Sequence, residues 1–286
     1  MLATLAFALG APLSRVAVPV TAAEVTFWRL ALATVVALGI ALAAGRPAAY
    51  LWDWRTFSLG GVLSLHFLLF TLAAQTTTTA HTLTLVYISP VLVAIGSALV
   101  LREPPRSMQL VGVLVTVVGV SVLVGFEPAA TDATLSGGVA ALGSGTAFAA
   151  YVLAGRYLRR SIPLTSYVLA VYGWAAVWVF PFALLSFDPA AYDGIGVLAI
   201  VILGIIPLGV GHTLLNAAVR RSSATVPNVI ATQEVTGGMI LSVLIHGDIL
   251  GPNTLLGVGV ALFGVVLVMV FARNSVADST TDGIEQ

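Results

Sequence analysis

Long apolar runs, separated by short polar segments, make up almost the whole chain of 286 residues. A helix needs about 20 apolar residues to cross the hydrocarbon core of a bilayer, where backbone polar groups must pair internally. Charges, Gly, Pro and Ser/Thr clusters mark the ends of the runs. The pattern predicts an all-α membrane protein with ten transmembrane helices, at about residues 2–20, 24–44, 57–75, 79–101, 107–125, 136–157, 164–186, 194–218, 224–246 and 252–272.

The composition agrees with a protein whose solvent is the bilayer. Hydrophobic residues make up 59% of the chain and charged residues only 8%, and the mean hydropathy is +1.05. Soluble domains carry about 25% charged residues. The net charge is zero, which offers no basic surface for nucleic acid, and the absence of Cys excludes disulfides and thiol catalysis. Membrane lipid is therefore an expected partner, and nucleic acid is not.

Arginine is distributed unevenly between the two sets of loops. The loops that face one side of a ten-helix arrangement carry ten arginines and the opposite loops carry none. Positive residues favour the cytoplasmic side, which predicts a multi-pass protein of the plasma membrane with both termini in the cytoplasm. The polar segment 273–286 is expected to form a disordered cytoplasmic tail. The ten arginines are Arg46, Arg55, Arg102, Arg106, Arg156, Arg159, Arg160, Arg220, Arg221 and Arg273.

The two halves of the chain resemble each other when one is shifted by 145 residues. Segment MQLVGVLVTVVGVSVLV then lies over NTLLGVGVALFGVVLVM, and Glu103 falls on Asp248. We interpret this as a duplication, with five helices in residues 1–125 and five in residues 136–272. An odd number of helices inverts the second copy in the membrane, and inverted repeats are typical of transporters whose substrate site lies between the halves.

A family resemblance follows from residues in both halves. The motif TTTAHTLTLVYISPVLVAIGSALVLREP followed by SMQLVGVLVTVVGVSVLV resembles the EamA-type branch of the drug/metabolite transporter (DMT) superfamily, and Arg29 resembles that family's second-helix arginine. The resemblance implies a ten-helix secondary transporter of small metabolites, often an exporter of amino acids. The chain departs from the family pattern at Val235, where proline is usual. The matching positions are Ser89, Pro90, Val91, Glu103, Gln109, Leu110, Gly112, Gly119, Glu234, Asp248, Leu255, Gly257 and Gly264.

Ionisable residues at membrane depth are the first candidates for a site, because they cost about 2.5–3.5 kcal/mol to insert. Glu234 should lie near the midplane, where it could bind an amino group or carry a proton, or could form a structural pair with Arg29 or Arg15. Arg29 could hold a substrate carboxylate, or could snorkel outward or pair with Glu24.

Other polar residues complete the predicted cavity. Pro90 should kink its helix, and the carbonyl that this kink frees fits best beside a cavity, which adds Tyr87 and Ser89. His212 and Asn216 share a helix face. His66 lies on the predicted helix 57–75, which is equivalent in the repeat to the helix of His212 and Asn216. The alternative for these three residues is interhelical hydrogen bonding, worth about 0.6 kcal/mol per contact. Gln233 adjoins Glu234. The predicted cavity residues are Glu234, Gln233, Tyr87, Ser89, Pro90, His66, His212, Asn216 and Arg29.

The sequence lacks a P-loop, an HExxH motif and a CxxC motif, so we expect neither an enzyme nor an ATP-driven pump, and no cofactor or metal. The prediction is a secondary transporter that exports a small metabolite by alternating access, with protons as a candidate coupling ion, as a monomer or homodimer. One alternative is an importer or exchanger of phosphorylated or nucleotide-linked metabolites. Another is a membrane scaffold or receptor subunit that transports nothing.

Overall fold

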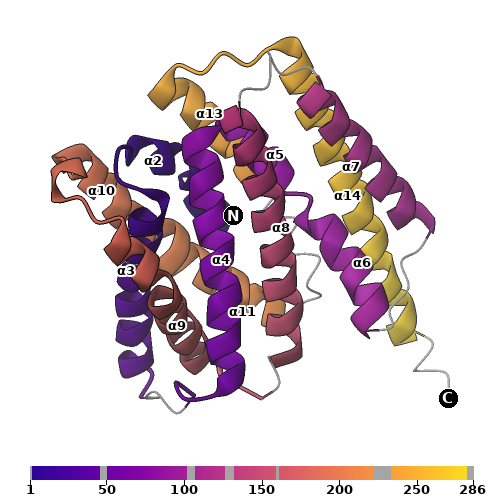
Figure 1. The fold of residues 1–286 in the computed structure, drawn as a ribbon. Coiled ribbons are helices and arrows are strands. Elements are labelled where there is room, and N and C mark those ends of the chain that lie inside the picture. The colour runs from indigo at the N-terminus through magenta and orange to yellow at the C-terminus, as the bar shows by residue number, and fades with distance from the viewer. Residues whose placement is uncertain are drawn as a thin grey trace.

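The computed structural model describes residues 2–45, 50–101, 107–125, 132–158, 161–221 and 233–281. Throughout these ranges the regular structure is helical, and the helices form one bundle (Figure 1). The helices are α1 (Leu2–Ala8), α2 (Gly10–Val16), α3 (Ala22–Ala43), α4 (Trp54–Thr76), α5 (Thr79–Val86), α6 (Ser89–Leu101), α7 (Ser107–Gly125), α8 (Asp132–Leu158), α9 (Leu164–Leu185), η1 (Pro189–Ala191), α10 (Gly194–Leu203), η2 (Gly204–His212), α11 (Thr213–Arg221), α13 (Gln233–His246) and α14 (Pro252–Thr281).

Among the described residues, five helical segments are long and apolar enough to cross a membrane by themselves. Each has 22 to 25 residues and a mean hydropathy between 1.4 and 2.5. The other apolar helices in the described ranges are shorter, with 10 to 17 residues each. The chain is therefore an all-helical membrane protein. The five long segments are Ala22–Ala43, Trp54–Thr76, Leu135–Leu158, Leu164–Leu185 and Gly194–Ala218.

Two of the predicted spans are each broken into two helices. The first breaks at Leu9, between α1 and α2. The predicted kink at Pro90 is confirmed, because α5 ends at Val86 and α6 begins at Ser89. Proline cannot donate a backbone hydrogen bond and its ring clashes with the preceding turn, so the helix restarts around it. The break leaves Tyr87 at the end of α5.

A third predicted span changes its helical type instead of breaking. Between α10 and α11 the segment η2 is a π-helix with Pro207 inside it and His212 at its end. Wider π-helical turns are rare and are frequently found at functional sites. Both Pro207 and His212 face the cavity described below.

The apolar core lies among α3, α4, α8 and α9. The hydrophobic side chains that these helices turn toward one another are almost completely inaccessible to solvent. Those with an exposed fraction of 0% include Leu30, Ala33, Leu63, Ala73, Ala141, Val168, Val171, Tyr172 and Ala175.

The helices α7 and α14 lie side by side along one edge of the bundle (Figure 1). A Cβ atom built on Gly112 would come within 2.7 Å of the Gly264 carbonyl oxygen, and one built on Gly119 within 2.8 Å of the Gly257 carbonyl oxygen. Small residues allow helix backbones to approach closely in membranes. The glycines that match between the two halves therefore make this contact possible.

The helix α14 continues to Thr281, beyond residue 272 where the apolar pattern ends. Residues 273–281 contain neither Gly nor Pro, so nothing in the local sequence breaks the helix there.

Four turns lie toward the upper and left side of the bundle in Figure 1: residues 17–21, 77–78, 186–193 and 247–251. We call this the Asp248 end. Thr21 and Ser186 hydroxyl oxygens lie 2.9 Å apart, which joins two of the turns. The opposite end carries the Asp53–Arg55 ion pair at the start of α4.

Glu24 lies at the Asp248 end and does not pair with Arg29, so the pairing that was one alternative from the sequence is not found. It forms a capping box with Thr21 and accepts a hydrogen bond of 2.9 Å from the Tyr192 hydroxyl. Burial raises the pKa of Tyr192 to about 12. Tyr192 also accepts a hydrogen bond of 3.0 Å from the Trp28 indole. Glu24 therefore anchors the turn at residues 186–193 to α3.

Candidate functional site

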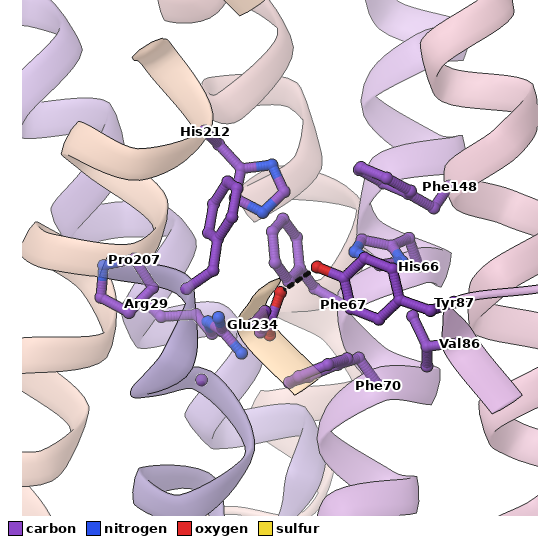
Figure 2. Close-up of a pocket in the computed structure, with 12 residues that line it drawn as sticks. Arg29, His66, Phe67, Phe70, Val86, Tyr87, Phe148, Pro207, His212 and Glu234 are labelled. Carbon is purple, nitrogen blue, oxygen red and sulfur yellow. Dashed lines mark hydrogen bonds between the residues drawn. The ribbon is translucent and has the colours of Figure 1, made fainter. Parts of the chain in front are cut away.

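A small cavity lies inside the bundle, where the irregular helices meet α3, α4 and α8. Its volume is about 30 Å³. A water molecule needs at least about 10–15 Å³ measured in this way, so the cavity has room for very few water molecules. Side chains from both halves of the chain face it (Figure 2). They are Phe7, Gly10, Arg29, His66, Phe67, Phe70, Val86, Tyr87, Phe148, Pro207, His212 and Glu234.

Glu234 and Tyr87 meet across the cavity. The Tyr87 hydroxyl donates a hydrogen bond to the Glu234 carboxylate (Figure 2). Glu234 comes from the first described turn of α13, and Tyr87 from the break between α5 and α6. Both side chains are buried. The bond therefore connects the two halves of the chain at the cavity.

Arg29 is the charged residue of α3 that reaches this cavity. Its side chain is 1% exposed, and its guanidinium lies over the Phe67 ring at 4.6 Å. Its Nη1 donates a long hydrogen bond of 3.4 Å to the Thr71 hydroxyl, whereas its Nε has no partner among the described residues. A cation that stacks on an aromatic face gains about 2 kcal/mol or more when desolvated, but the buried Nε–H donor remains available to a ligand.

Arg29 and Glu234 both face the cavity without forming an ion pair. Within the described ranges the ion pairs are Arg15–Asp248 and Asp53–Arg55. The sequence left open that Glu234 forms a structural ion pair with Arg29 or Arg15. The described part of the structure contains neither of these pairs. One cationic and one acidic group face the same space separately, and a ligand carrying both charges could contact each of them.

Two histidines form another wall, and their ring centroids are 6.3 Å apart. The His66 Nδ1 lies 3.0 Å from the Ser144 carbonyl oxygen and 2.9 Å from the Ser144 hydroxyl, which fixes the ring against α8. The His212 ring packs against Phe7 with 4.8 Å between centroids. His212 Nδ1 has no partner in the described part of the chain. His212 therefore presents a second buried polar atom without a protein partner.

Several residues predicted from the sequence do not line the cavity. Ser89 is completely buried beside it, and its hydroxyl has no partner among the described residues. Pro90 acts on the backbone, through the break that precedes it. The side chain of Gln233 lies outside the described part of the structure.

Asn216 belongs to a separate hydrogen-bond network. Its Nδ2 donates to the Tyr151 hydroxyl at 2.8 Å, to the His212 carbonyl oxygen at 2.9 Å and to the Tyr172 hydroxyl at 3.4 Å. The bonds to Tyr151 and Tyr172 are interhelical, of the kind that polar residues form in membrane bundles, whereas the bond to His212 stays within the same helical segment. Asn216 therefore makes the interhelical hydrogen bonds that were the alternative to a place in the cavity, while His66 and His212 line the cavity.

The apolar residues that line the cavity could not be identified from the sequence. Phe7, Phe67, Phe70 and Phe148 look like lipid-facing or core residues in a chain that is apolar throughout. Gly10 was also missed, although a Cβ atom there would lie only 3.3 Å from Glu234 Oε1. A usable signal was Pro207, since it is a proline inside a predicted span, as Pro90 is.

The fold and the site together define an integral membrane protein with a buried, charged cavity between its two halves. A profile of the EamA-like transporter family matches residues 1–125 and again residues 135–270. The chain therefore belongs to the EamA-like transporter family of the DMT superfamily, as its motifs predicted. Members of this family are transporters and not enzymes.

A solved structure supports the fold over nearly the full length. It is described only as "Crystal structure of protein", and it superimposes with a TM-score of 0.75 at 22% sequence identity. The match covers 95% of this chain and 96% of that chain. No curated protein matches the sequence.

Proposed function

We propose that this protein is a secondary transporter that exports a small zwitterionic metabolite, an amino acid or related solute, by alternating access. The observation that carries the proposal is the cavity in which unpaired Arg29 and Glu234 face the same space. The Arg29 Nε–H suits a substrate carboxylate and Glu234 suits an ammonium group. The phenylalanine rings suit an apolar portion of the substrate.

The small volume of the cavity supports a site that opens and closes during transport. A space of about 30 Å³ is too small for any amino acid, since a single water molecule already needs about 10–15 Å³ measured in this way. The substrate must therefore enter a more open arrangement and be enclosed later. Ten spans in two inverted five-helix repeats would provide that motion, because inverted halves can exchange conformations.

The same proposal includes orientation and coupling. The arginine distribution supports cytoplasmic termini in the plasma membrane, which puts the Asp248 end outside. Glu234 is the proposed carrier of a coupled proton, because its carboxylate lies inside the cavity where the substrate would bind. The protein would work as a monomer or a homodimer.

The alternative substrate class finds less support in the cavity. A phosphorylated or nucleotide-linked metabolite carries several negative charges, and phosphate is usually bound by several arginines or lysines. Arg29 is the one such residue among those that line the cavity, and Glu234 faces it as an acid.

Transport by purified protein in liposomes tests the proposal. We expect flux of at least one member of a panel of labelled amino acids, and we expect Glu234→Gln to reduce that flux or change its dependence on pH. Glu24→Gln is the matched control, because Glu24 is also buried but anchors the turn at residues 186–193 and does not line the cavity. Unchanged flux in Glu234→Gln would contradict the role of Glu234. A chain that moves no member of a broad metabolite panel would favour the scaffold or receptor subunit.

A further inference from the structure

An ion pair joins the two halves of the chain at the Asp248 end. Arg15, near the end of α2, contacts Asp248 in the turn between α13 and α14. Two contacts form the pair, Nη1 to Oδ2 at 2.5 Å and Nη2 to Oδ1 at 3.1 Å. Such a two-point contact fixes orientation as well as distance. The pair therefore holds the short helix α2 against the end of α13.

Hydroxyl groups extend the ion pair into a cluster. Arg15 Nη1 donates to the Ser242 hydroxyl at 2.9 Å, and Ser242 donates to Asp248 Oδ2 at 2.5 Å. The Thr79 hydroxyl oxygen lies 2.8 Å from the Ser242 hydroxyl oxygen. His246 adds a contact of 3.0 Å to the Pro12 carbonyl oxygen. Three helices and one turn thus meet through a single polar cluster, which we call the Arg15 cluster.

The Arg15 cluster lies between the cavity and the Asp248 end. Gly10 lines the cavity on α2, five residues before Arg15, which is about 7.5 Å along a helix. Glu234 lines the cavity on α13, eight residues before Ser242, which is about 12 Å along that helix. Two helices that form the cavity wall are therefore tied together further out, on the way to the aqueous phase.

The helices α1 and α13 pack closely together near the Arg15 cluster. A Cβ atom built on Gly237 would lie 2.8 Å from the Ala8 Cβ. The break at Leu9 separates α2 from α1 at this level. The broken helix therefore packs directly on α13 where α1 ends.

We propose that the Arg15 cluster is a gate: the Arg15–Asp248 pair keeps the cavity closed at this end, and its separation opens the cavity to the solution there. The role rests on the proposed transport function. The side chains of Arg15 and Asp248 are 24% and 19% exposed. Partly exposed ion pairs contribute little net free energy, because water compensates the charges when they separate. Such a pair can break and re-form during each transport cycle, which a fully buried pair could not do readily.

Thiol labelling tests the gate without any knowledge of the substrate. The chain has no Cys, so Val86→Cys places a single thiol in the cavity lining. The protein would be placed in lipid nanodiscs and treated with a charged, membrane-impermeant methanethiosulfonate. We expect labelling to be slow in Val86→Cys alone and about tenfold faster after the addition of Asp248→Asn or Arg15→Gln, since tenfold corresponds to a small shift in the closed–open equilibrium.

Two further variants separate gating from general loosening. The exchange of charges in Arg15→Asp with Asp248→Arg should restore slow labelling. Asp53→Asn breaks the ion pair at the opposite end of the bundle and should leave the labelling rate unchanged. If the single variants do not fold, Ser242→Ala keeps both charges and should still accelerate labelling, by a smaller factor.

Folded single variants that label no faster than Val86→Cys would overturn the gate, as would faster labelling that the charge exchange fails to reverse. The labelling result does not depend on flux. A chain with a working gate and no amino acid transport would contradict the proposed substrate, and a transporting chain with unchanged labelling would contradict the gate.

Discussion

The Tyr87 hydroxyl donates a hydrogen bond to the Glu234 carboxylate, across 147 residues of sequence. The bond exists because proline at position 90 interrupts a helix and leaves Tyr87 at the interruption. Glu234 stands where the repeat would place Ser89, so the second half carries an acid where the first half carries a small hydroxyl group. The cavity is therefore asymmetric in charge, although the two halves resemble each other in sequence.

Removal of the Tyr87 hydroxyl should weaken transport more than folding. Tyr87→Phe keeps the ring and its packing but leaves the buried Glu234 without its partner. Hydrogen bonds to charged groups contribute about 1.5–3 kcal/mol, so we expect flux in liposomes to fall by about 10- to 100-fold with the melting temperature little changed. Tyr151→Phe is the matched control, because Tyr151 bonds Asn216 instead; it should lower stability first. Equal flux in Tyr87→Phe and the parent would contradict a role in transport.

Replacement of Arg29 by an apolar residue should raise thermal stability and abolish transport. A buried charge without a close acidic partner costs folding free energy, and apolar residues of similar size are often tolerated better. Arg29→Met should therefore raise the melting temperature, measured by a thiol-independent dye assay, while flux falls to background. Arg29→Lys should also lose most flux, because it lacks the planar group that stacks on Phe67. A lower melting temperature in Arg29→Met would indicate a structural role.

Close packing of α7 on α14 should tolerate no side chain at Gly264. A Cβ atom there would lie 2.7 Å from the Gly112 carbonyl oxygen, whereas one on Gly259 meets nothing within 4 Å. We expect Gly264→Leu to cost at least about 1–3 kcal/mol through overpacking and Gly259→Leu to cost little. Thermal unfolding in detergent measures both. Similar melting temperatures for the two variants would show that α7 and α14 do not touch through their backbones.

The Arg15–Asp248 pair should persist through mild acidification. Burial alone would raise the pKa of Asp248, but hydrogen bonds from Arg15 and Ser242 and the charge of Arg15 outweigh it and hold the pKa below 3.8. A depressed pKa means that the stabilisation is present above the unfolded pKa and is lost as pH falls through the folded pKa.

We therefore expect the difference in melting temperature between the parent and Asp248→Asn to stay constant from pH 8 to pH 5, and to shrink only at more acidic pH. Melting curves of both proteins across this range measure it. A difference that disappears already near pH 6 would show that Asp248 is not held in its ionised form by Arg15.

Much of the helical framework could be predicted because its causes are local. Apolar length identifies membrane helices wherever it occurs in the chain. The break at Pro90 was predictable because proline removes a backbone donor in any context. The family could be predicted from the order of its motifs. Glu234 and Arg29 could be identified as candidate site residues because a charge at membrane depth is costly.

Pairing between side chains was not predictable in the same way. Nearly every face of these helices is apolar, so the sequence does not distinguish a face toward lipid from a face toward a cavity. Asn216 was expected beside His212 in the cavity, yet its amide is bonded to Tyr151 and Tyr172. Arg15 was one of two candidate partners for Glu234 in the structural alternative, yet it reaches Asp248.

The sequence by itself determined the class of protein, its helices, its kink at Pro90 and its charged residues at depth, since each follows from composition or from a few neighbouring residues. Only the tertiary structure decided which charges meet. Tyr87 reaches Glu234 and Arg15 reaches Asp248 across the whole chain. Such contacts depend on how the helices rotate and cross, and packing between helices that are apolar on all sides fixes those rotations.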